Sequence, residues 1–106
     1  MKLDCKKPKY MAAALVCGYS LHYEFCDSID EAVAECYEYL GEWIESSRDA
    51  MENRTDPTAE EIGKWNSMLK THRVWVEAYD STKGRYDAVW EPTPDELESY
   101  GWCELS

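Results

Sequence analysis

The fold is decided by residues 73–91, whose sequence is Arg73-Val-Trp-Val-Glu-Ala-Tyr-Asp80, then Ser81-Thr-Lys-Gly84, then Arg85-Tyr-Asp-Ala-Val-Trp-Glu91. The two flanking segments alternate strictly, as in β-strands whose successive side chains point to opposite faces. The four residues between them suit a turn, and Gly84 can adopt the positive φ that hairpin turns favour. The stretch therefore predicts a β-hairpin.

The two faces of this hairpin differ in the side chains they carry. Val74, Val76 and Ala78 share one face, and Trp75 and Tyr79 share the other. Aromatic side chains are frequent anchors of protein interfaces, so Trp75 and Tyr79 are candidate partner-binding residues. The alternative is that the aromatic face packs under helices, where its bulk would fill the core. Acids rim the aromatic face at Glu77, Asp80 and Asp87.

Two helices are predicted before the hairpin. Ser28 and Glu31 have the spacing of a capping box that begins a long helix. A second helix begins at either Asp56 or Thr58, and the short loop between the helices predicts an antiparallel helical pair. The apolar stripe of the first helix is Ile29, Ala32, Val33, Cys36, Tyr37, Leu40, Trp43, Ile44 and Met51, and that of the second is Ile62, Trp65, Met68, Leu69 and His72.

The two ends of the chain add further elements. Residues 10–17 and 21–26 predict a second hairpin around Gly18, although the alanines at 12–14 leave a helix as an alternative for the first segment. Thr93 and Glu96 form another capping-box pattern, and Gly101 ends the short helix that follows. Residues 102–105 could add a terminal strand.

These elements predict an α+β fold in the order ββααββα. We expect an antiparallel sheet of about four strands, built from two hairpins, with the two-helix hairpin packed on one face. A chain of 106 residues suits one domain, here residues 10–106, preceded by a basic N-terminal arm at residues 1–9 that carries four lysines. The order of the strands in the sheet does not follow from the sequence.

The composition is strongly acidic, with 22 Asp and Glu against 11 Lys and Arg and a net charge of −11. Such a protein repels nucleic acids and anionic membranes and attracts cationic partners, although acidity also serves solubility. The five cysteines are odd in number and include no CxxC, which favours reduced thiols and a cytoplasmic location. In a phage protein, that cytoplasm would be the host's.

The long helix carries a row of acids spaced alternately by four and three residues. We call it the acidic row: Glu31, Glu35, Glu38, Glu42, Glu45, Asp49 and Glu52. A helical wheel places this row opposite the apolar stripe. Its six successive like-charged pairs cost together ~1–3 kcal/mol. That cost is small enough for a merely solvated face, and a basic partner that docked on the row would relieve it.

The sequence contains no catalytic motif, such as a phosphate-binding glycine loop, a nucleophile elbow or HExxH. Cys17, His22 and Cys26 lack the paired spacing of structural zinc sites. His72 at a helix end is expected to satisfy terminal carbonyls. We therefore expect a protein that is not an enzyme, with no catalytic residues, no bound metal and no cofactor.

In size, charge and aromatic content, the chain resembles the small acidic inhibitors that phages encode against host nucleic-acid enzymes, including DNA mimics and anti-CRISPR proteins. The resemblance implies a partner protein with a basic, nucleic-acid-binding surface, and neither direct nucleic-acid binding nor membrane binding. The alternative is a small regulatory or assembly subunit that binds a protein through its aromatic sheet face, as a homodimer in one form of this hypothesis.

Overall fold

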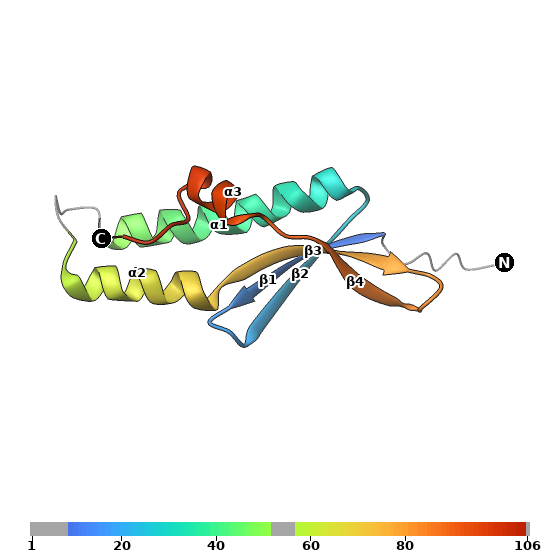
Figure 1. The fold of residues 1–106 in the computed structure, drawn as a ribbon, viewed down its shortest axis with the longest axis horizontal. Helices are drawn as coiled ribbons and strands as arrows, with labels where there is room; N and C mark the ends of the chain where they lie inside the picture. The colour runs from blue at the N-terminus through green and yellow to red at the C-terminus, as the bar shows by residue number, and fades with distance from the viewer. Residues whose placement is uncertain (1–8, 52–56, 106) are drawn as a thin grey trace.

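The structure is a computed structural model that describes residues 9–51 and 57–105. Four antiparallel strands form one sheet in the order β2-β1-β3-β4, so the predicted α+β class is confirmed. Glu52 and residues 1–8 of the predicted basic arm lie outside the described residues. Along the chain the elements are β1 (Tyr10–Val16), β2 (Ser20–Cys26), α1 (Ile29–Met51), α2 (Ala59–Thr71), β3 (Arg73–Asp80), β4 (Arg85–Trp90) and α3 (Pro94–Tyr100) (Figure 1).

Strand β1 lies in the interior of the sheet, between β2 and β3. The helix considered for its alanines is not formed, because Ala12, Ala13 and Ala14 lie fully buried within paired strands. Positive φ angles at Cys17 and Gly18 make the turn into β2, so β1 ends one residue earlier than predicted.

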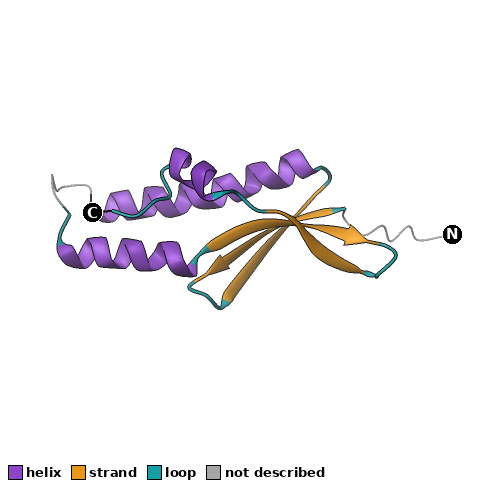
Figure 2. Cartoon of the chain, in the orientation of Figure 1, coloured by secondary structure: helices purple, strands orange, loops and turns teal. Residues whose placement is uncertain are grey.

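Helix α1 covers one face of the sheet and forms the core with it (Figure 2). The apolar stripe of α1 meets the aliphatic residues of β1 and β3 there. This core includes Ala12, Ala14, Val74 and Val76 from the strands, and Ala32, Cys36 and Leu40 from the helix. The aliphatic face of β3 is therefore the one under the helix, and the face with Trp75 points away from it.

The second half of α1 extends beyond the sheet, and α2 runs back alongside it (Figure 1). Aromatic rings fill the space between these helices. The ring centroid of Trp102 lies 5.6 Å from that of Trp43 and 5.4 Å from that of Trp65, and the imidazole of His72 stands edge-on to Trp43 at 4.8 Å. Bulky rings hold the helices in place where the sheet no longer supports them.

Residues 102–105 do not form the predicted strand. The side-chain amide of Asn66 donates to the carbonyl of Leu105 over 3.0 Å and accepts from its N–H over 2.9 Å. The indole N–H of Trp65 donates to the carbonyl of Cys103 over 2.9 Å. Side chains of α2 therefore satisfy backbone groups that a neighbouring strand would otherwise bind.

The predicted helix starts are observed where the structure describes them. Thr58 with Glu61, and Thr93 with Glu96, each form a complete capping box. Of the two starts considered for the second helix, Thr58 is the N-cap, and Asp56 lies outside the described residues. No helix in the described ranges combines the length and the apolar character that crossing a bilayer requires.

Candidate partner-binding surfaces

The acidic row lies on the face of α1 that points away from the core. Its members at 31, 38, 42, 45 and 49 are exposed, and Glu35 is partly buried. The intervening turns bury Ala32, Cys36, Leu40 and Ile44 on the opposite side. The predicted separation of a core face and an acidic face is therefore observed from residue 31 to residue 49.

The described part of the acidic row has no basic partner among residues 9–51 and 57–105. The salt bridges there involve Glu60, Glu91 and Asp87, none of which belongs to the row. Glu31 instead completes the N-terminal cap of α1, since its carboxylate accepts from the N–H of Asp27 over 3.2 Å. No basic side chain of the described residues therefore neutralises the row.

A glutamate from the sheet extends this negative surface. The pKa of Glu35 is raised, first by burial and then by the charges of Glu38 and Glu24. The pKa of Tyr39 is raised by burial and then by Glu24 and Glu35. Glu24 belongs to β2, so the acidic surface continues from α1 onto the edge of the sheet. Sequence reasoning missed Glu24, because its nearness to the row depends on the strand order.

Both aromatic candidates of the hairpin, Trp75 and Tyr79, lie on the open face of the sheet, which we define as the face opposite α1. The indole N–H of Trp75 donates to Glu77 over 2.8 Å, and the guanidinium of Arg73 lies 5.3 Å from the centroid of the Trp75 ring. The ring of Tyr79 lies 5.3 Å from that of Tyr86. These contacts hold the aromatic side chains in place at the surface.

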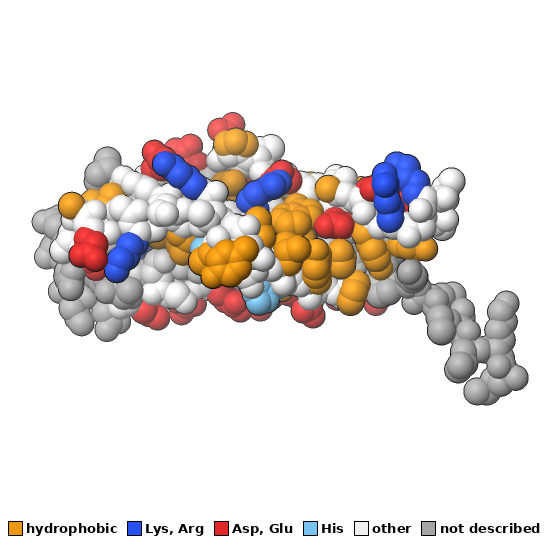
Figure 3. All heavy atoms as spheres, turned by 90° about the horizontal axis from the view of Figure 1, so that it is seen from below, with side chains coloured by type: hydrophobic (Ala, Val, Ile, Leu, Met, Phe, Trp, Pro, Cys, Tyr) orange, Lys and Arg blue, Asp and Glu red, His pale blue; other side chains and the backbone are white. Residues whose placement is uncertain are grey.

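The open face also includes apolar side chains of β2 that were not predicted as site residues. Leu21, Tyr23 and Phe25 are 49%, 44% and 57% exposed. The ring of Phe25 lies 6.4 Å from that of Tyr86 on the opposite edge strand, and Met11 on the same face is only 7% exposed. Figure 3 shows hydrophobic side chains gathered over the strands, with acidic side chains along the border.

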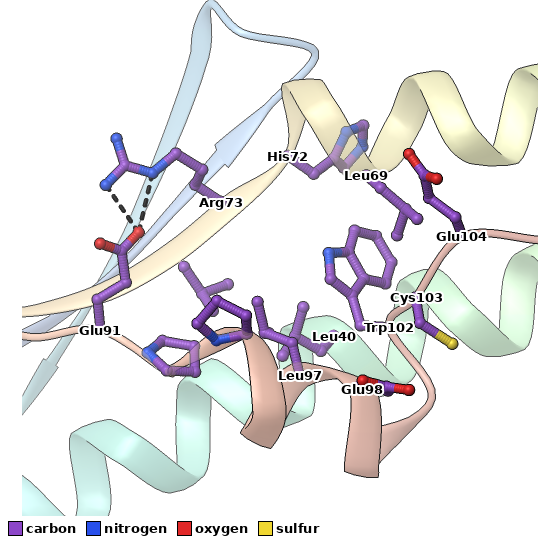
Figure 4. Close-up of a pocket in the computed structure, with 13 residues that line it drawn as sticks. Leu40, Leu69, His72, Arg73, Glu91, Leu97, Glu98, Trp102, Cys103 and Glu104 are labelled. Carbon is purple, nitrogen blue, oxygen red and sulfur yellow. Dashed lines mark hydrogen bonds and ion pairs between the residues drawn. The ribbon is translucent and has the colours of Figure 1, made fainter.

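A cavity of about 350 Å³ lies between α1, α3 and the start of β3 (Figure 4). Its middle is apolar, with Leu40, Leu97 and Trp102 among the lining residues. At one end, Arg73 donates two hydrogen bonds to Glu91, over 2.7 and 3.0 Å. This end is therefore neutralised within the protein.

His72 lines the same cavity and has a structural role. Its backbone N–H donates to the carbonyl of Met68, and its Nδ1 lies 3.2 Å from the hydroxyl of Thr71. The ring lies at the helix end as expected, since a hydrogen bond with the backbone of Met68 acts to raise its pKa, and it also packs edge-on against Trp43. Burial is the larger influence and lowers the pKa of the imidazole below its ordinary value of 6.5.

Two further findings bear on the function. Among the described residues, no group of three or more His, Cys, Asp and Glu side chains could hold a metal ion. Comparison of the chain with protein-family models, curated proteins and solved structures finds no match in any of the three. The function must therefore be argued from the surfaces described above.

Proposed function

We propose that this chain is a non-enzymatic acidic binding protein that inhibits a nucleic-acid-handling protein by occupying its basic site. The observation that carries the proposal is the acidic row of α1, whose members at 31, 38, 42, 45 and 49 are exposed and which forms no salt bridge within residues 9–51 and 57–105. A DNA-mimic or anti-CRISPR-like phage inhibitor, acting in the cytoplasm of the host, would have these properties.

The length and charge of the row suit such a partner. Residues 31–49 of a helix span ~27 Å at a rise of 1.5 Å per residue, a reach comparable to that of a short run of DNA phosphates. Glu24 broadens the charged strip beyond a single line, as the raised pKa of Glu35 indicates. A basic surface docked here would relieve the repulsion among these carboxylates.

The test is a binding experiment with matched charge reversals. Immobilised protein is incubated with lysate at low salt, and the retained proteins are eluted with increasing salt or with double-stranded DNA. Reversal of Glu38, Glu42 and Glu45 to Lys should abolish retention of proteins that DNA displaces. The control reverses three exposed acids outside the row to Lys and should retain them: Glu60, Glu98 and Glu104. The proposal fails if both variants behave alike, or if DNA displaces nothing.

A second candidate function rests on the open face of the sheet. Leu21, Tyr23 and Phe25 leave large apolar surface exposed beside Trp75 and Tyr79, which supports a regulatory or assembly subunit that docks through this face. Binding through it should tolerate salt and be lost on Trp75→Ala. A matched variant on α3, Tyr100→Ala, should bind normally, and equal binding by both variants would contradict this function.

A further inference from the structure

Strand β2 is an edge of the sheet, and no other segment of the described chain pairs with its outer side. Free edges expose unpaired N–H and C=O groups, and proteins commonly block them with Lys, Pro or bulges. The sequence of β2, Ser-Leu-His-Tyr-Glu-Phe-Cys, contains no Lys or Pro and one charged residue, Glu24, and its pairing with β1 has no bulge. The other edge strand, β4, has a register shift against β3 and a salt bridge between Arg85 and Asp87. Edge protection is therefore concentrated on β4.

The backbone geometry identifies which groups of β2 point outward. The N–H of Tyr79 donates to the carbonyl of Lys9 over 2.9 Å, continuing the register in which Tyr10 opposes Ala78. Since hydrogen-bonded positions alternate along an antiparallel pair, odd-numbered residues of β1 bond β3 and even-numbered ones bond β2. The even-numbered residues of β2 lie opposite the even-numbered residues of β1, so their backbone groups form the hydrogen bonds to β1. The free backbone groups of the outer edge are those of Leu21, Tyr23 and Phe25.

The sequence of β2 is complementary to itself in one antiparallel register. With Tyr23 opposite Tyr23 of a second copy, Leu21 lies opposite Phe25, and all three outward-facing residues enter hydrogen-bonded pairs. On the other face, His22 then lies opposite Glu24, where an imidazole N–H can donate to a carboxylate. A shift by two residues in either direction would oppose Glu24 to Glu24 or His22 to His22. Of these three registers, only the one around Tyr23 pairs His22 with Glu24 at both positions, and this pairing favours it.

We propose that this chain forms a twofold-symmetric homodimer in which β2 pairs with β2 of a second copy around Tyr23. The interface is isologous, so the Leu21–Phe25 and His22–Glu24 pairs each occur twice, and Tyr23 meets Tyr23 once, on the axis. The two sheets become one continuous sheet, and the exposed apolar side chains of Leu21, Tyr23 and Phe25 adjoin those of the partner copy on the open face. This proposal does not depend on the inhibitory function.

Added salt should change the affinity of the dimer and the affinity for a basic partner in opposite directions. A twofold axis perpendicular to the sheet keeps both copies of α1 on the same side, so Glu24 and the two acidic rows flank the axis. Added salt screens their repulsion, and the dimer should tighten. Binding of a basic partner to the acidic row should weaken over the same range of salt. The two proposals therefore predict opposite effects of one variable.

The experiment is sedimentation equilibrium of the full chain and of a set of charge swaps. Wild type should show a reversible monomer–dimer equilibrium. His22→Glu opposes two acids and should raise the dissociation constant about tenfold or more. Glu24→His should weaken the dimer as well. The double variant His22→Glu with Glu24→His should restore the dimer, and a mixture of the two single variants should form heterodimers. Val89→Glu, at an exposed apolar site of β4, is the control and should not change it.

A second measurement uses the unmodified chain. Amide hydrogen exchange at Tyr23 should slow as protein concentration rises, because its N–H has no strand partner within the described part of one chain and is bonded in the dimer. The dimer proposal is overturned if wild type stays monomeric up to about 1 mM, the range of the weakest specific complexes. It is also overturned if exchange at Tyr23 is independent of concentration, or if the double variant fails to recover the association lost in the single ones.

Discussion

Replacing Glu38 by glutamine is expected to stabilise the fold at low ionic strength. Glu38 is exposed on α1, three residues after Glu35 and four before Glu42, and none of the salt bridges in the described ranges holds it. Glutamine keeps the length of the side chain and nearly the same helix propensity while removing the charge. The substitution thus removes the two like-charged pairs that Glu38 forms with Glu35 and Glu42, and changes little else.

The expected gain follows from those two pairs. Each like-charged pair at this spacing costs ~0.2–0.5 kcal/mol, so the variant should gain ~0.4–1 kcal/mol in the free energy of unfolding. The gain depends on pH through Glu35, whose pKa is raised above its ordinary value of 4.5, with Glu38 the largest contribution from a charge. A raised pKa means that Glu35 supports the fold below pH 4.5 and that this support is lost as pH rises through its folded value. Glu38→Gln removes one of the charges that raise this pKa, so the variant should lose less stability over this pH range. Its advantage over wild type in the free energy of unfolding should therefore appear as pH rises above 4.5.

The assay is urea unfolding followed by tryptophan fluorescence, at low salt and on both sides of pH 4.5. Glu104→Gln, at an exposed site outside α1, controls for the change in net charge. At about 1 M salt, where the screening length is ~3 Å, the advantage of Glu38→Gln should vanish. A variant no more stable than the control, or an advantage unaffected by salt and pH, would refute the idea that the acidic row is under repulsive strain.

Three further predictions concern the core. Trp102→Ala should lower the free energy of unfolding by ~3–5 kcal/mol in urea titrations, because this buried ring packs between the helices. Asn66→Ala should cost ~1–3 kcal/mol and accelerate amide exchange at Leu105, since it leaves the backbone groups of Leu105 unpaired. Burial raises the pKa of Cys36 to about 12, so a thiol reagent should modify exposed Cys17 in the native protein and Cys36 only on unfolding.

Much of the fold could be predicted because local signals specify it. Alternation from residue 73 to residue 91 predicted β3 and β4, and spacing between a threonine and a glutamate predicted the caps at Thr58 and Thr93. Strand order could not be predicted, because it depends on pairings between distant segments such as β1 and β3. Residues 102–105 suggested a strand, and the positions of Trp65 and Asn66 on α2 explain why they form none.

The candidate surfaces were predicted to a smaller extent. Helical spacing sufficed to place the acidic row opposite the core, and alternation placed Trp75 and Tyr79 on one face without saying which face the helices cover. Glu24 was missed because it approaches α1 only when β2 lies at the edge of the sheet. The outward-facing backbone of β2 likewise follows from the sheet order, which a local pattern does not contain.

The attachment of residues 102–105 to α2 also bears on the order in which the fold is completed during synthesis. Trp65 and Asn66 hold backbone groups that lie 38 and 39 residues later in the chain. A ribosome makes all four strands before it makes this segment, so the sheet and the first half of α1 can assemble while the far ends of α1 and α2 still lack Trp102 between them. During that interval Trp65 lacks its ring contact with Trp102, and Trp43 has only Tyr39 and His72 to pack against, so the nascent chain is most open to chaperones and proteases at its helical end.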